Sequence, residues 1–231
     1  MKILAFESSA KAASVALCED GNLIAEHYRH SGLTHSQTLL PMAESLLKIG
    51  NLELSDLDCL AVSVGPGSFT GLRIGTSLVK GLCWASDKPA IGVSTLEAMA
   101  FLCRDLYPGI VICCCMDARR NQVYNALFRA ENNMPERLCP DRALSLNELY
   151  DELKDIKSEI FFVGDGAGLC YTELGSALSN CRLAPSGIRM QRALGVCLAA
   201  ENIGKPASAD LLIPTYLRLS QAERERQAKL F

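Results

Sequence analysis

The sequence predicts an α/β protein of two lobes, each with a mixed sheet and flanking helices. Two observations carry this prediction. Apolar, strand-like runs alternate with helix-like segments, and the opening of the chain recurs after Pro108 and Gly109. The repeated unit is a strand, an acid, a polar turn and a returning strand; its two copies are 3–6, Glu7, 8–11 and 14–18, and 110–116, Asp117, 118–122 and 123–128.

In the first half, the continuous apolar run at 3–6 is typical of a strand covered on both faces. Asp20, Gly21 and Asn22 predict a hairpin turn. Thr34 is a plausible N-cap for a first helix that Gly50 ends. The predicted elements are strands at 3–6, 14–18, 23–28, 59–64 and 90–93, and helices at 35–49, 71–85 and 95–106.

The second half opens at Pro108 and Gly109, which are the best candidate for a boundary. We therefore expect an N-terminal lobe of residues 1–106 and a smaller C-terminal lobe of residues 107–231 that ends in a charged tail. After the repeated unit, the predicted elements are helices at 147–153, 169–178 and 189–202 and a strand at 160–163.

Composition excludes several classes of protein. The chain has 231 residues, is 49% hydrophobic and carries a net charge of -3, which argues against disorder and against strong nucleic-acid binding by this chain alone. No run approaches the ~20 apolar residues of a membrane helix, and the apolar stretch before Glu7 is too short for the core of a signal peptide. The eleven cysteines form no Cys-x-x-Cys pair. We expect buried, reduced thiols and a cytoplasmic location.

Two acid-turn units are candidates for phosphate binding. Glu7, Ser8 and Ser9 form one, and Asp117 begins the other. In such a turn the backbone N–H groups point outward, and the acid holds a metal or a water. Gly164 and Gly166 would let an adenosine approach the backbone of the second lobe. The alternative is that these are hairpin turns with ordinary polar caps.

The most distinctive string runs from Gly65 through Gly67 to Gly75 and joins a predicted strand to a helix. Its glycines leave N–H groups at the helix N-terminus, which is a possible anion site. No Gly-Lys-Ser/Thr follows, so the string is not a P-loop. The alternative is that the glycines permit a tight turn and close helix packing. No cluster of histidines and cysteines with metal-ligand spacing is present, so we expect no metal site.

These strings together resemble the TsaB family, also called YeaZ, over essentially the whole chain. The matching strings are Glu7 to Ser9, Gly65 to Gly75, Gly92 to Leu96, Asp117 to Tyr124 and Pro214 to Arg218. The resemblance implies a two-lobed actin/Hsp70/sugar-kinase-like (ASKHA) fold. It also implies the dimerisation subunit of the bacterial complex that makes N6-threonylcarbamoyladenosine at position 37 of tRNAs.

In that family the catalytic partner is the related subunit TsaD, and the ATPase TsaE is the third member. The resemblance implies a homodimer when the chain is alone, tRNA binding only through the complex, no membrane contact and no cofactor. TsaD carries two metal-binding histidines where this chain has Thr95 and Met99. Neither side chain replaces an imidazole at iron or zinc. A non-catalytic subunit is therefore expected.

Two alternatives to this function remain. A small kinase or ATPase of the same fold is disfavoured by the short chain and by Glu7, where such kinases usually place Asp. A glycoprotease-like metallopeptidase is disfavoured by the missing metal ligands.

The first two helices are the expected partner interface. Apolar residues of helix 35–49 spread over about 180° of its circumference, whereas an ordinary surface helix needs a stripe only slightly wider than ~100°. Helix 71–85 shows the same excess, and the resemblance points to the same helices. The predicted interface residues are Leu39, Leu40, Ala43, Leu46, Leu47, Arg73, Gly75, Leu78, Val79 and Leu82.

Overall fold

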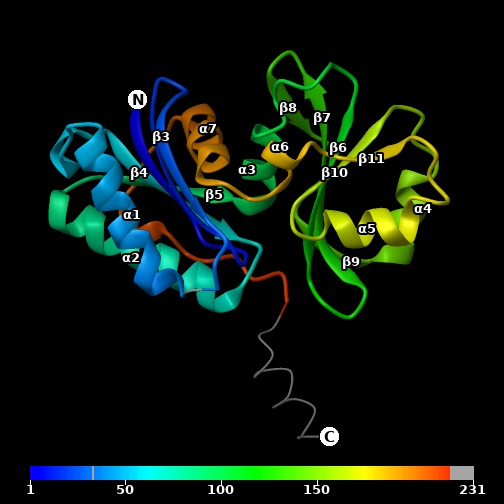
Figure 1. Ribbon diagram of the computed structural model, residues 1–231, viewed down its shortest axis with the longest axis horizontal. Coiled ribbons are helices and arrows are strands. Elements are labelled where there is room, and N and C mark those ends of the chain that lie inside the picture. Colours follow the sequence, from blue (N-terminus) through cyan, green and yellow to red (C-terminus); the bar gives the residue numbers. More distant parts are fainter. Residues whose placement is uncertain (33, 219–231) are drawn as a thin grey trace, which may run out of the picture.

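The computed structural model describes residues 1–32 and 34–218; the predicted charged tail lies outside these ranges. Two mixed β-sheets with flanking helices form two lobes (Figure 1), so the predicted fold class is confirmed. The first half of the chain contains β1 (Lys2–Glu7), β2 (Ala13–Glu19), β3 (Asn22–Arg29), α1 (His35–Ile49), η1 (Leu54–Asp56), β4 (Cys59–Gly65), α2 (Phe69–Ser86), β5 (Ala90–Ser94) and α3 (Thr95–Phe101).

The second half adds more short elements than its sequence predicts. It contains β6 (Val111–Asp117), β7 (Gln122–Glu131), β8 (Met134–Arg137), β9 (Arg142–Ser145), α4 (Leu146–Leu153), β10 (Ile160–Val163), α5 (Ala167–Leu174), β11 (Cys181–Leu183), α6 (Ser186–Arg189), α7 (Ala193–Ile203) and η2 (Ala209–Leu211). Strands β8, β9 and β11 have three or four residues each, too few for a period-2 pattern to emerge.

The two sheets share one topology, which confirms the internal repeat. The first sheet has the order β3-β2-β1-β4-β5, and the second has β11-β10-β6-β7-β8, with β9 also paired to β7. In each sheet the opening strand lies at the centre. It pairs antiparallel with the next strand and parallel with a strand that follows a helix. Strand β1 therefore corresponds to β6, and α2 corresponds to α5.

Two predicted helices have different bounds in the structure. The helix expected at 95–106 ends at Phe101 and continues only as turns. The helix expected at 189–202 begins at Ala193, because Arg192 is extended and the Arg189 carbonyl accepts a hydrogen bond from Gly164 N–H at 2.6 Å. Arg189 itself belongs to the short helix α6.

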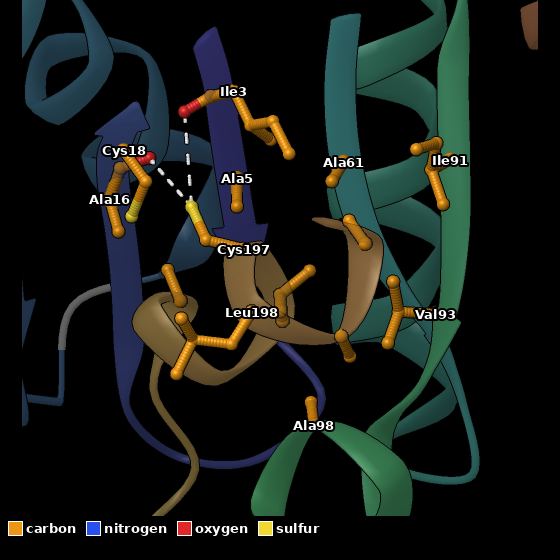
Figure 2. Packing of buried hydrophobic residues seen from close by; sticks show 14 of the residues in the cluster. Ile3, Ala5, Ala16, Cys18, Ala61, Ile91, Val93, Ala98, Cys197 and Leu198 are labelled. Atoms are coloured by element: carbon orange, nitrogen blue, oxygen red, sulfur yellow. Dashed lines mark hydrogen bonds between the residues drawn. The ribbon is translucent and has the colours of Figure 1, made fainter. Parts of the chain in front are cut away.

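The last helix of each half covers the sheet of the other half. Helix α3 packs on the second sheet, where Leu96 and Met99 join a core with Ile112 and Phe128, and its Ala98 and Phe101 also contact the core of the first sheet. Helix α7 packs on the first sheet (Figures 1 and 2). The expected boundary, which placed all of residues 107–231 in the second lobe, is therefore corrected: α7 belongs to the core of the first lobe.

Helix α7 lies against the first sheet and against α3 at the same time. The Cys197 thiol donates to the backbone carbonyls of Ile3 and Ala16 at 3.8 and 3.6 Å (Figure 2). On another side of the helix, a Cβ added at Gly195 would lie 2.2 Å from the Ala98 carbonyl oxygen of α3. Only glycine allows this approach between the two helices.

We expect Gly195→Ala to lower the free energy of unfolding by about 1–3 kcal/mol, because the added methyl group forces α3 and α7 apart. Gly81→Ala is the matched control. Gly81 lies inside α2, and a Cβ there would meet nothing within 4 Å. That change should raise stability by about 0.5–1 kcal/mol. Urea unfolding followed by circular dichroism measures both, and equal effects of the two changes would contradict close packing at Gly195.

Candidate functional site

A cleft of about 530 Å³ lies between the lobes, within the size range of ligand sites. Five segments form it: the β1–β2 turn, the N-terminus of α2, the β6–β7 turn with the adjoining strand residues, the β10–α5 turn and a segment near the end of the described chain. The lining residues are Ser9, Ala10, Lys11, Gly67, Ser68, Phe69, Thr70, Met116, Asp117, Ala118, Arg119, Tyr124, Asp165, Thr215, Tyr216, Leu217 and Arg218.

The two acid-turn units have the same local geometry. Ser9 N–H donates to Glu7 Oε1 at 2.6 Å, and Arg119 N–H donates to Asp117 Oδ1 at 2.7 Å. Each carboxylate therefore accepts the backbone N–H two residues further on, as polar caps of turns do. Glu7 is buried, whereas Asp117 is exposed and opens onto the cleft.

The carboxyl group of Glu7 is buried and only partly hydrogen-bonded. Its Oε2 is buried without a hydrogen-bond partner, and so is the Ser63 hydroxyl. Burial raises the pKa of Glu7 above its usual value, hydrogen bonding to Ser9 opposes the shift, and the negative charge of Asp165 adds to it. Burial thus makes ionisation of Glu7 less favourable than in water, while the hydrogen bond from Ser9 N–H keeps the side chain on its own turn.

Asp165 is the second acid that lines the cleft. It is accessible within the cleft, and Gln191 Nε2 donates to its Oδ1 at 2.8 Å. Desolvation by the surrounding protein raises the pKa of Asp165, the hydrogen bond from Gln191 opposes the shift, and the charge of Asp117 adds to it. We call the part of the cleft that Asp117 and Asp165 line its floor, and this part is acidic.

Close packing explains the glycine string. A Cβ at Gly67 would lie 2.6 Å from the Ser9 carbonyl oxygen, and one at Gly71 would lie 2.0 Å from that of Ser8. The N-terminus of α2 therefore lies directly on the β1–β2 turn. Ser68 Oγ, as the N-cap, accepts from Gly71 N–H.

The other predicted glycines also contact backbone. A Cβ at Gly164 would lie 2.1 Å from the Cys115 carbonyl oxygen, and one at Gly166 would lie 2.8 Å from the Met116 carbonyl carbon. Of the predicted nucleotide-cleft residues, Ser9, Gly67 and Asp117 line the cleft. Glu7 and Ser8 are buried, and Gly65, Gly164 and Gly166 do not line it.

The segment 215–218 is the part of the site that sequence reasoning missed. Thr215 N–H donates to the Val64 carbonyl at 2.7 Å, which anchors the segment to the first lobe. Arg218 Nη1 donates to the Ala118 carbonyl at 2.6 Å, which attaches it to the second lobe. The only signal in the sequence was the string from Pro214 to Arg218, and that string carried no recognisable chemistry.

Tyr216 connects this segment to α2. Its ring centroid lies 4.7 Å from that of Phe69, and its hydroxyl accepts from Arg73 Nε at 3.1 Å. The Arg73 guanidinium lies 3.8 Å above the Phe69 ring. The rings of Phe69 and Tyr216 therefore form one wall of the cleft, and Arg73 packs against both rings.

Thr95 and Met99 lie on α3 and are buried. The Thr95 hydroxyl has no hydrogen-bond partner, and Met99 packs in the core beneath the second sheet. Within residues 1–32 and 34–218, no group of three or more His, Cys, Asp or Glu side chains converges as metal ligands do.

Half of the predicted interface residues face the protein's own core. Leu39, Ala43, Leu46, Gly75 and Val79 are buried against the first sheet or its turn, so they cannot form a surface in the folded chain. The other five, Leu40, Leu47, Arg73, Leu78 and Leu82, are exposed or half-buried. Together with half-buried Ile74, the four leucines form what we call the α1–α2 surface. Helices α1 and α2 themselves lie on the outer side of the first lobe (Figure 1).

Comparisons with known proteins place these features in context. The family model TsaD, tRNA N6-adenosine threonylcarbamoyltransferase, matches residues 29–225. The tRNA threonylcarbamoyladenosine biosynthesis protein TsaB of Bacillus subtilis is 31% identical over 96% of this chain and 96% of its own length. The solved structure of YeaZ from Pseudomonas aeruginosa matches with a TM-score of 0.73 and 27% identity, covering 94% of this chain and 99% of that one.

A more distant solved structure shares the fold alone. The (R)-2-hydroxyglutaryl-CoA dehydratase component A of Acidaminococcus fermentans matches with a TM-score of 0.50 and 11% identity, covering 89% of this chain and 100% of that one.

The buried acid predicts a pH-dependent effect of Glu7→Gln. Because the pKa of Glu7 is raised in the folded state, the folded chain retains a proton that the unfolded chain releases above about pH 4.5. Wild-type stability therefore falls as the pH rises toward the folded pKa. Glutamine does not ionise, so the Glu7→Gln variant does not lose stability in this way. The stability of the variant relative to wild type should increase from pH 5 to pH 8, by about 1.4 kcal/mol per unit of pKa elevation.

Glu148→Gln is the matched control for this measurement. Hydrogen bonds from Ser145 lower the pKa of Glu148, so this carboxylate is ionised in both states above pH 5. The difference in the free energy of unfolding between Glu148→Gln and wild type should therefore stay the same between pH 5 and pH 8. Urea unfolding at pH 5, 6, 7 and 8 tests both variants; a pH-independent difference for Glu7→Gln would show that Glu7 is an ordinary carboxylate.

Proposed function

The chain belongs to the TsaB family, and from this premise we propose that it is the non-catalytic partner subunit in threonylcarbamoyl transfer to N6 of adenosine 37 in tRNAs. Its partners would be the transferase TsaD and the ATPase TsaE. Alone, the chain would form a homodimer. No helix among residues 1–32 and 34–218 could cross a membrane, and we place the protein in the cytoplasm, where tRNAs are modified.

The observation that carries the proposal is the α1–α2 surface. Leu40 and Leu47 lie two turns apart on α1, and Ile74, Leu78 and Leu82 lie on successive turns of α2. The side chain of Leu40 is 39% exposed, while Leu47, Leu78 and Leu82 pack against the core with only part of their surface. A row of apolar side chains on two adjacent helices is typical of a protein interface.

Small residues on α2 would let a partner helix come close. Ser77 and Gly81 are exposed, one turn apart, and a Cβ at Gly81 would meet nothing within 4 Å. Trp84, on the next turn, is 93% exposed, and tryptophan is enriched among the residues that contribute most to binding. A partner with a similar helix pair would meet this surface in a pseudo-symmetric arrangement.

The chemistry of α3 supports a role without catalysis. At the positions where TsaD has metal-binding histidines, this chain has Thr95 and Met99, and both are buried. A threonine hydroxyl and a thioether are poor ligands for zinc or ferrous iron. The chain would therefore contribute a surface to the complex, while the partner supplies the reacting groups.

We expect Leu40→Glu and Leu47→Glu to weaken association with TsaD by at least about 100-fold. A charge introduced into this surface would be buried on binding without a counter-ion, which costs about 3 kcal/mol or more. Both residues are partly accessible, so the variants should keep the wild-type circular dichroism spectrum. Isothermal titration calorimetry and co-elution on gel filtration measure the association.

Two control variants show whether a loss of binding comes from the α1–α2 surface. Tyr171→Glu places the same charge on α5, the counterpart of α2 in the second lobe, where Tyr171 is 43% exposed; it should bind TsaD normally. Ala43→Glu changes a buried residue and should unfold the first lobe instead. Wild-type affinity of folded Leu40→Glu and Leu47→Glu would place the interface elsewhere.

A further inference from the structure

The interlobe cleft is lined by charges of both signs: Asp117 and Asp165 form its floor, and Lys11, Arg119 and Arg218 form what we call its rim. From this arrangement we propose that it holds one nucleotide of a single-stranded RNA segment, with the base directed inward and the phosphates at the rim. The inference rests on the proposed function, since that function makes a tRNA the substrate of the complex. It adds a direct RNA contact by this subunit and names the residues that make it.

Cations from both lobes line the cleft or lie beside it. Lys11 is exposed on the β1–β2 turn, Arg119 lines the cleft from the β6–β7 turn, and Arg218 lines it from the segment 215–218. Arg120 is exposed beside Arg119, and Arg73 lies next to the wall formed by Phe69 and Tyr216. In a chain with a net charge of -3, this is a local concentration of positive charge suited to a phosphate backbone.

The N-terminus of α2 adds backbone donors on the same side. Helix α2 has 18 residues, and its first turn, Phe69 and Thr70, lines the cleft. The first N–H groups of a helix have no acceptor within it, and the helix dipole favours a negative charge there. A phosphate between this turn and Lys11 would contact both the N–H groups of the helix and the charged side chain of Lys11.

The β6–β7 turn holds its arginines in an uncommon backbone conformation. Arg119, Arg120 and Asn121 have φ values of 63°, 57° and 55°. Three consecutive non-glycine residues in the left-handed region are unfavourable, and such strain is concentrated at binding sites. Here the strained turn presents two arginines at the opening of the cleft.

The two acids determine the orientation of the nucleotide. Asp117 and Asp165 both line the cleft and interact electrostatically with each other, so a phosphate placed beside them would be repelled unless a divalent cation came with it. The amino groups of adenine or cytosine are hydrogen-bond donors, and a carboxylate accepts from them. The same charges that exclude a phosphate from the floor therefore favour an amino-bearing base.

Aromatic rings complete the site. Tyr124 lines the cleft from β7, and Tyr216 and Phe69 line it from the opposite wall. Unstacked RNA bases bind by stacking on such rings and by hydrogen bonds along their edges. Because the rim supplies only a few cations, the contact is weak by itself and adds to the binding of the complex.

The test is the affinity of the isolated full-length chain for a fluorescein-labelled oligo(A) octamer, measured by fluorescence anisotropy in EDTA from 50 to 200 mM salt. Lys11→Glu and Arg120→Glu should each weaken binding about tenfold at 50 mM salt. Each should also reduce the slope of log K against log salt by about 0.7. Lys157→Glu carries the same charge change at an exposed position before β10, at the opposite end of the sheet, and should change affinity less than about twofold.

Tyr216→Leu separates stacking from charge. It should weaken binding by about 5-fold to 100-fold without changing the salt slope. Tyr171→Leu removes an equally exposed tyrosine from α5 and should have no effect. Adding AMP and ATP distinguishes RNA from free nucleotide. Competition by ATP only when Mg²⁺ is present would place phosphates on the floor and overturn the proposal.

Undetectable RNA binding at 50 mM salt, or equal effects of Lys11→Glu and Lys157→Glu, would also overturn it. Neither result touches the proposed function, which depends on association with TsaD. Conversely, a chain that binds RNA through the cleft but does not associate with TsaD would contradict the proposed function and leave the RNA site standing.

Discussion

Helix α7 packs on the first sheet, helix α3 lies between the two sheets, and the close contact of the two helices at Gly195 and the Ala98 carbonyl connects the lobes. Because each sheet is covered by a helix from the other half, apolar packing continues from one lobe to the other. Arg137 on β8 adds polar links, since it contacts Glu97 on α3 and also Asp141, which accepts from the Ser94 hydroxyl. The two lobes therefore pack together as one unit, and the cleft between them results from this packing.

Much of the architecture was predictable from the sequence, because each half begins with the same strand, acid and turn. The packing of α7 on the first sheet and of α3 on the second was not predictable. Helix α7 is apolar on most of its circumference, since it contacts both the first sheet and α3, and such a pattern does not say which sheet the helix covers. The boundary at Pro108 and Gly109 follows the repeat correctly along the chain, but the structure returns residues 193–203 to the first lobe.

The site was predictable only in part, for two physical reasons. A helical wheel counts apolar residues without knowing the direction of the sheet, so it does not separate buried Leu39 from exposed Leu40. The cleft wall depends on a contact between Val64 and Thr215, which lie far apart in the sequence and carry no shared pattern. In contrast, the turn acids were found because their chemistry is local: each carboxylate accepts a backbone N–H two residues further on.

Helix α2 connects the two proposed surfaces. Its first turn lines the cleft, and its later turns carry Leu78 and Leu82 of the α1–α2 surface. Gly71 and Gly75 hold the start of the helix against the Ser8 backbone carbonyl and hydroxyl, so the helix cannot move without the β1–β2 turn. A partner on the α1–α2 surface therefore meets a helix whose N-terminus is already placed at the rim. These glycines therefore keep the cleft and the partner surface in a constant relation.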